Sequence, residues 1–132
     1  MSLHYEVVLA CALRDDLPDD VIAALRWHLG ERPEPPPGLD PHVHAYPLLE
    51  PDPYSGLPGG DVAALRPGDH HGWGLFTRNL WLDDDLGMLT GLLDLIAPHA
   101  EHDGYAGHFR ATDDAGPTVL VFRDGGHALH ES

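Results

Sequence analysis

The sequence has no lysine, one cysteine and three serines, and each scarcity excludes a class of protein. Without lysine the chain has no Walker-type phosphate loop, which requires that side chain. The single cysteine, Cys11, cannot form an intrachain disulfide, and its apolar surroundings predict an inert, packed thiol. None of the serines, Ser2, Ser55 and Ser132, lies in a nucleophile-elbow motif. The sequence therefore offers no serine or cysteine nucleophile.

Positive charge and long apolar runs are also scarce. Seven arginines stand against 22 acidic residues, which gives a formal net charge of −15. A nucleic-acid surface needs basic side chains for the phosphates, and an anionic membrane surface would repel this chain. No apolar run approaches the roughly 20 residues of a membrane span, and the N-terminus lacks the basic start of a signal peptide. We expect a soluble, cytoplasmic protein that binds neither nucleic acid nor membrane.

Proline separates two regular parts of the chain from a long middle segment. Ten of the thirteen prolines lie within residues 31–71. Because proline fixes φ and removes a backbone donor, neither a helix nor an interior strand is expected to run through this segment. It also carries several leucines, so we predict a proline-rich flap that packs on the body, with a short edge strand at 42–46. The whole chain, 1–132, is predicted to form one domain with this flap inserted.

Hydrophobic spacing predicts the elements on either side of the flap. Apolar side chains alternate at period two in the first strand and recur at helical spacing in the two helices. Gly30 and Pro98 mark helix ends, and the tail after Gly126 is expected to be loose. The predicted elements are a strand at 3–13, a helix at 17–29, a strand at 72–82, a helix at 83–97, and hairpin strands at 105–112 and 118–123.

This order of elements predicts an α+β fold. Two helices with one apolar stripe each fit a two-layer sandwich, in which both cover one face of an antiparallel sheet. The nearest known pattern is a ferredoxin-like β-α-β-β-α-β-β variant. Its sheet face away from the helices would be open, and an exposed apolar face is typical of a subunit interface. We therefore expect a homodimer or a protein partner.

Eleven histidines are the most unusual feature of the composition. His42 and His44 alternate at one end of the flap, and His70 and His71 follow Asp69 at the other. Imidazoles at such spacing would suit a three-ligand site for a divalent transition metal such as zinc. The alternative is that they are ordinary surface histidines of a lysine-free, acidic chain, which then needs no cofactor. Five others are expected at the surface: His4, His28, His99, His102 and His130.

Two arginines interrupt predicted strands. If these strands pair, Arg78, His108 and Arg110 share one sheet face with Glu6 and His4. Guanidinium and imidazole groups placed in this way would bind a small anionic ligand. The alternative is a ladder of cross-strand ion pairs that only keeps the open face in water.

Four segments of the second regular part are distinctive in combination: Arg78–Leu82, Leu95–Pro98, Gly104–Arg110 and Pro117–Phe122. Together they resemble a group of small uncharacterised bacterial α+β proteins. The likeness is concentrated in residues 76–122 and extends to the first strand and helix, whereas the flap departs from the pattern. The resemblance implies an α+β fold and no particular activity. Within it, Arg110 and the pair Gly104 and Gly107 stand out as more than packing residues.

The leading functional hypothesis is a non-catalytic binding or protein-interaction module that uses the open sheet face or the flap. It rests on the missing nucleophiles, the acidic surface and the length of the flap. The alternative is a small metal-dependent enzyme with a site formed by His42, His44 and either His70 or His71. The sequence leaves open whether the protein is an enzyme.

The histidines predict a loss of solubility at acidic pH. Protonation of all eleven changes the formal net charge from −15 to −4, and the usual histidine pKa is about 6.5. We expect turbidity to rise between about pH 6.5 and 5, measured by light scattering at constant ionic strength. Full solubility at the sequence pI of 4.8 would contradict this.

Overall fold

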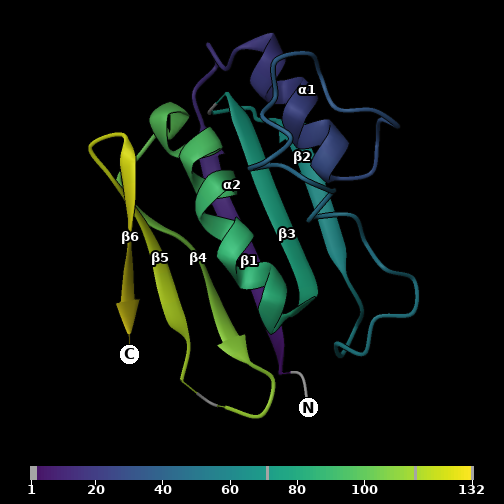
Figure 1. The fold of residues 1–132 in the computed structure, drawn as a ribbon. Coiled ribbons are helices and arrows are strands. Elements are labelled where there is room, and N and C mark those ends of the chain that lie inside the picture. The colour runs from purple at the N-terminus through teal and green to yellow at the C-terminus, as the bar shows by residue number, and fades with distance from the viewer. Residues whose placement is uncertain (1–2, 71, 115, 132) are drawn as a thin grey trace.

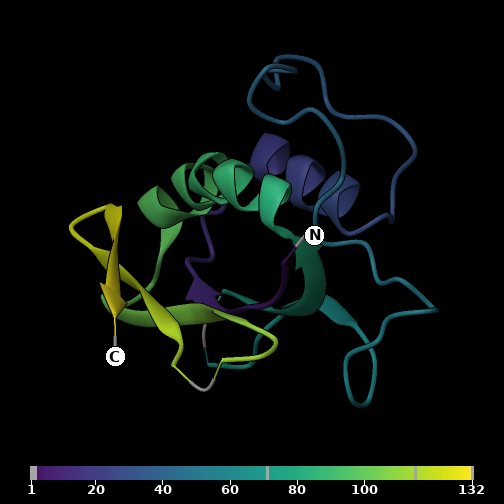
Figure 2. The same cartoon turned by 60° about the horizontal axis from the view of Figure 1, so that its bottom comes forward.

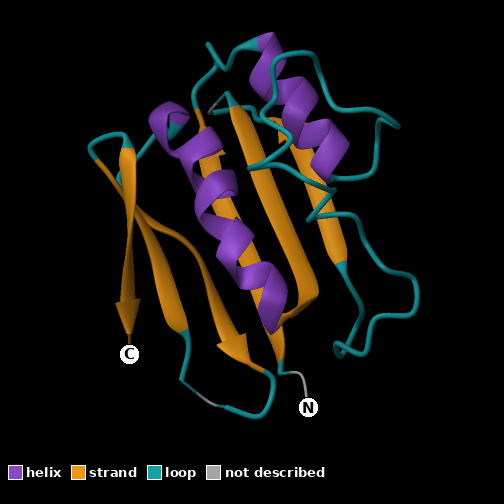
Figure 3. Ribbon diagram, viewed as in Figure 1, coloured by secondary structure: helices purple, strands orange, loops and turns teal. Residues whose placement is uncertain are grey.

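A computed structural model describes residues 3–70, 72–114 and 116–131. Strands predominate, and the two α-helices are short (Figures 1 and 3). The elements in chain order are β1 (His4–Leu13), α1 (Asp19–His28), β2 (Val62–Pro67), β3 (Trp73–Leu82), the 3₁₀ turn η1 (Asp83–Met88), α2 (Leu89–Ile96), the 3₁₀ turn η2 (Ala97–His99), β4 (Gly104–Ala111), β5 (Thr118–Arg123) and β6 (Gly126–Glu131).

The strands form one antiparallel sheet with the order β2-β3-β1-β4-β5-β6. Strand β1 is central and pairs with β3 along its whole length and with β4 on its other side. Both α-helices lie over one face of the sheet (Figure 2). In the described part of the chain, no helix is long and apolar enough to cross a membrane. We call the sheet face turned away from the helices the outward face.

The predicted ferredoxin-like β-α-β-β-α-β-β sandwich is wrong. The sheet has six strands in the order β2-β3-β1-β4-β5-β6, accompanied by only two short helices. Strand β2 forms at Val62–Pro67, whereas residues 42–46 contain turns and no strand. Strand β6 forms from the tail that was expected to be loose. Pro67 is tolerated because β2 is an edge strand, and Asp124 and Gly125, both with positive φ, make the tight turn that returns β6 onto β5.

The alternating pattern of the first strand is confirmed. Val7, Leu9 and Leu13 are buried beneath the helices with Cys11 packed beside them, while Val8, Ala10 and Ala12 alternate with them and point to the outward face. Helix α1 contributes Val21 and Leu25 to this core, and other apolar residues come from α2 and β5. Burial of each such aliphatic side chain stabilises the fold by about 1.5–3 kcal/mol. The core therefore fixes which side of every strand faces water.

The proline-rich segment packs on α1 and β3, as expected from its leucines. Leu48, Leu49 and Leu57 are buried. The indole nitrogen of Trp81 donates to the Leu48 carbonyl at 3.0 Å, and the Leu49 amide donates to the His28 carbonyl at 2.9 Å. These contacts attach the middle of the segment to the body, although it contains no helix and no strand between residues 31 and 61.

A buried histidine pair strengthens this attachment and corrects the surface position predicted for His28. His28 is 0% exposed, because it lies on the core side of α1 beside Leu25. The Leu48 amide donates to His28 Nδ1 at 3.2 Å, so the proton resides on Nε2, which donates to His44 Nδ1 at 3.0 Å. Both rings must stay neutral for this chain of hydrogen bonds to form.

Acid is expected to weaken the attachment of the segment. Burial, assisted by the neighbouring His44, lowers the pKa of His28 to about 4, and burial also lowers the pKa of His44 although Asp40 opposes it. Since the unfolded pKa is about 6.5, His28 contributes stability that is complete above that pH and is lost as pH falls towards 4. The expected loss is about 3 kcal/mol, measured by urea unfolding at pH 7.5 and 4.5.

Two substitutions separate this effect from the titration of other groups. His28→Gln keeps an acceptor and a donor but cannot be protonated, so the fall in unfolding free energy between the two pH values should shrink. His130→Gln, at an exposed position on β6, should leave that fall unchanged. Equal pH dependence in wild type and His28→Gln would contradict the assignment.

Candidate functional site

Strand pairing brings one carboxylate and two guanidinium groups together on the outward face. Glu6 in β1 lies opposite Arg110 in β4, and Arg78 in β3 lies opposite Val8 in β1. Directly opposed residues of antiparallel strands point to the same face, as do residues two apart along one strand. Three side chains therefore converge from three adjacent strands. We call this group, which consists of Glu6, Arg78 and Arg110, the Glu6 cluster.

The two arginines hold the Glu6 carboxylate from both sides. Arg78 Nε donates to Glu6 Oε2 at 2.7 Å, and Arg110 Nε donates to Glu6 Oε1 at 3.0 Å. Glu6 is only 7% exposed, whereas both arginines are half-buried. Arg78 Nη1 also donates to the carbonyls of Pro58 and Gly60 at 2.7 and 2.9 Å, which brings the end of the proline-rich segment onto the outward face.

One glycine permits this convergence. At Gly107 in β4 a Cβ atom would lie 2.0 Å from the Val8 carbonyl oxygen, and the residue has φ of +151°, which L side chains rarely adopt. Strand β4 can therefore approach β1 closely at this position. Three residues further on, Arg110 lies directly opposite Glu6.

The Glu6 cluster carries an uncompensated positive charge. Burial alone would raise the pKa of Glu6, but the hydrogen bonds and charges of Arg78 and Arg110 outweigh burial and hold that pKa below its usual value. Glu6 is thus ionised at neutral pH and cancels one of the two guanidinium charges. The remaining charge of +1 lies in a half-buried position, where water compensates it only partly.

Hydrogen-bond donors of the cluster also remain available. Arg110 Nη1 donates to the carbonyls of Ala111, Thr112 and Asp114 at 3.4, 3.5 and 3.1 Å. Within residues 3–70, 72–114 and 116–131, Nη2 of Arg110 and Nη2 of Arg78 make no hydrogen bond. A guanidinium group has five N–H donors, so the Nη2 group of each arginine can donate hydrogen bonds to a ligand.

His108, the third residue predicted for this site, lies near the cluster without joining it. It shares the outward face with Arg78, but Val8 lies between them in the register. His108 Nδ1 pairs with the Tyr105 hydroxyl at 2.8 Å. Among the described residues the structure therefore joins two of the three predicted ligand-binding side chains, Arg78 and Arg110, to Glu6, which was expected on the same face.

The structure describes three of the four histidines predicted to bind a metal, and these three lie in different surroundings. His42 is exposed in a turn, His44 is buried against His28, and His70 lines a different cavity near Arg14. His71 lies outside the described residues. In the described part of the chain, no group of three or more histidine, cysteine, aspartate or glutamate side chains is arranged to hold a metal ion.

Burial of Cys11 disfavours its reactive thiolate form. The residue lies in β1 with its side chain half-buried, and burial raises the pKa of its thiol to about 12. Thiolate, and not thiol, is the reactive form of cysteine. The packed position predicted for this thiol is confirmed, since Cys11 lies against the core.

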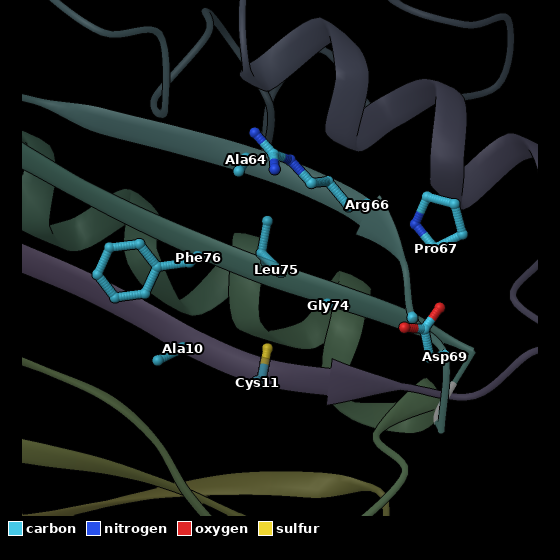
Figure 4. A pocket seen from close by; sticks show the side chains of 10 residues that line it. Ala10, Cys11, Ala64, Arg66, Pro67, Asp69, Gly74, Leu75 and Phe76 are labelled. Atoms are coloured by element: carbon cyan, nitrogen blue, oxygen red, sulfur yellow. The ribbon is translucent and has the colours of Figure 1, made fainter.

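The outward face also has a cavity away from the Glu6 cluster, and its lining carries no net formal charge. Its lining includes the small residues Ala10 and Ala64, which flank Phe76 from β1 and β2 in the register, and Gly74, two residues before Phe76 on β3 (Figure 4). Its charged groups are Arg66 and Asp69, whose formal charges cancel. The Glu6 cluster is therefore the better candidate for recognition of a charged ligand.

Comparisons with models of known protein families, with curated proteins and with solved structures give no match. The arguments on function therefore rest on the geometry of the Glu6 cluster.

Removal of the central carboxylate is expected to destabilise the fold. In Glu6→Gln the two guanidinium groups face each other without a negative charge, and loss of one member of a buried ion pair costs about 3 kcal/mol. Glu131→Gln changes the same charge at an exposed position of β6 and should alter stability by less than about 0.5 kcal/mol. Urea unfolding at pH 7.5 measures both, and equal effects would show that the Glu6 cluster does not support the sheet.

Proposed function

We propose that the chain is a non-catalytic binding module that recognises an anion at the Glu6 cluster. The observation that carries this proposal is the ratio of charges, since two half-buried guanidinium groups share a single carboxylate. An ion-pair ladder that served only to keep the face in water would need one carboxylate for each arginine. An anion bound beside Arg78 and Arg110 would neutralise the remaining charge and use their free donors.

The distribution of arginine along the sheet supports the proposal. Four of the seven arginines point to the outward face, where Glu6 is the one carboxylate of the described strands. The outward arginines are Arg66, Arg78, Arg110 and Arg123. A net charge of −15 does not prevent anion binding there, because charges beyond a Debye length of about 8 Å are largely screened at physiological ionic strength. With the cytoplasmic location inferred from composition, anionic metabolites are the ligands at hand.

Rigidity of the cluster further favours binding. The carbonyls of Pro58 and Gly60 hold Arg78, and Glu6 holds both guanidinium groups, so little side-chain entropy remains to be lost when a ligand binds. Acid-base catalysis is disfavoured at this place. The pKa of Glu6 is held below its usual value, so its carboxylate is a poor proton acceptor at neutral pH.

Anions are expected to raise the melting temperature through Arg110. At ten times its dissociation constant a ligand stabilises the folded state by about 1.4 kcal/mol, or about 5 °C for a chain of this size. Acetate and phosphate at constant ionic strength should give such a rise in wild type. Arg110→Gln leaves a neutral Arg78–Glu6 pair and should abolish the rise, as should the double substitution of Arg78 and Arg110 by Gln.

Arg123→Gln is the matched control. It removes a guanidinium from the outward face at an exposed position away from the cluster, so the anion response should persist. This comparison also removes the general stabilisation that some anions exert by exclusion from protein surfaces. An unchanged response in Arg110→Gln would refute the proposal. A second copy docked on the same face would compete with the anion, so the oligomeric state is measured by light scattering in the same titration.

A further inference from the structure

A cavity opens beside the Glu6 cluster, where the proline-rich segment crosses the outward face. It has a volume of about 440 Å³ and lies between the ends of β1, β3 and β4 and residues 56–58. Arg110 and His4 line its polar side, and Leu57 and Leu80 line its apolar side. Cavities of about 300–1,000 Å³ with a few converging polar groups are typical of small-molecule sites.

The polar side of the cavity continues the Glu6 cluster. Arg110 belongs to both, and its Nη2 group makes no hydrogen bond within the described residues. His4 lies two residues before Glu6 on β1 and therefore on the same face. An anionic group placed here meets a guanidinium and an imidazole, while Arg78 supplies the second positive charge behind Glu6.

The apolar side comes from two elements that are distant in the sequence. Leu57, from the proline-rich segment, is 5% exposed, and Leu80, from β3, is half-buried. At Gly56 an added Cβ atom would meet only Leu80 Cδ2, at 4.0 Å, so this wall has free space in front of it. A compact apolar group in this space would be removed from water against the two leucines, which favours binding.

We propose that the cavity binds an organic monocarboxylate with a compact aromatic or branched aliphatic body, an inference that rests on the proposed function and narrows its ligand class. The excess charge of the Glu6 cluster is +1, which matches one carboxylate and only partly neutralises a phosphate dianion. Besides Gly56 and Thr112, two leucines and Pro58 line the remainder of the cavity, and an inorganic anion would leave that apolar wall uncovered.

Benzoate tests this inference, with acetate, phosphate and neutral benzyl alcohol as comparison probes. Isothermal titration of the full chain at pH 7.5 and constant ionic strength should show benzoate binding about tenfold or more tightly than acetate, because a buried ring adds apolar contact. Benzyl alcohol should bind about tenfold more weakly than benzoate, since it lacks the charge. Arg110→Gln should abolish the binding of benzoate and acetate alike.

The substitution Gly56→Leu distinguishes the contribution of the apolar wall to ligand affinity from the contribution of the charge. Its side chain would start in the space before Leu80, where an added Cβ atom meets no atom of Arg110 within 4 Å, and Gly56 does not have positive φ. The substitution should raise the dissociation constant of benzoate about tenfold and change that of acetate by less than about twofold. Gly87→Leu is the control, because an added Cβ there meets no atom within 4 Å and the residue lies outside the cavity. If Gly56→Leu does not fold, ¹H–¹³C spectra of the His4 ring during benzoate titration of wild type locate the ligand instead.

The outcomes distinguish the inference from the function on which it rests. Benzoate binding no tighter than acetate, phosphate binding more tightly than benzoate, or unchanged benzoate affinity in Gly56→Leu would overturn the assigned ligand class and leave anion recognition standing. Unchanged ¹H–¹³C signals of the His4 ring at saturating benzoate would contradict the placement of the ligand in this cavity. Failure of every anion to bind would overturn both the inference and the proposed function.

Discussion

The pairing of β1 on both of its edges is the constraint on which the rest of the structure depends. Because a strand alternates its side chains, the central strand directs Val7 and Leu9 into the core and Glu6 to the outward face. The same register places Arg110 and Arg78 on neighbouring strands within hydrogen-bond distance of Glu6. Core packing and the charged cluster are therefore two consequences of one register, and a shift of one residue would exchange them.

The proline-rich segment is attached to both faces of this sheet. On the helix side it is anchored by the buried pair of His28 and His44 and by the Trp81 bond to Leu48. On the outward side the carbonyls of Pro58 and Gly60 bind Arg78. A segment without helix or strand from residue 31 to 61 thus obtains its order from hydrogen bonds to the body. It also supplies one wall of the cavity beside Arg110, so binding at this cavity depends on how the segment is attached.

The spacing of hydrophobic residues in the sequence predicted most helices and strands correctly, but it did not predict the edge strand β2 or the burial of His28. Period-two alternation and helical spacing located β1, β3, β5 and the helices, because burial of one face leaves a direct trace in the sequence. Strand β2 left little trace, since an edge strand of six residues that ends in proline lacks such a pattern. His28 was expected at the surface because burial of an imidazole depends on its partners, here Leu48 and His44, which come from a distant segment. The spacing of His28 from Leu25 on the buried side of α1 was the available signal.

The sequence by itself determined the scarcity of serine and cysteine, the excess of negative charge, the core-facing positions and the presence of Arg78 and Arg110 in strands. These properties depend on residue type and short spacing alone. Tertiary structure decided the order of six strands, the separation of His42, His44 and His70, and the convergence of two arginines on one carboxylate. Each of those outcomes depends on the pairing of β1 with strands far along the chain or on contacts of the proline-rich segment. Arg78 and Glu6 are 72 positions apart, and Arg110 and Glu6 are 104 positions apart. Such pairings are selected by the packing of the whole core, because no local spacing encodes which strand lies beside which.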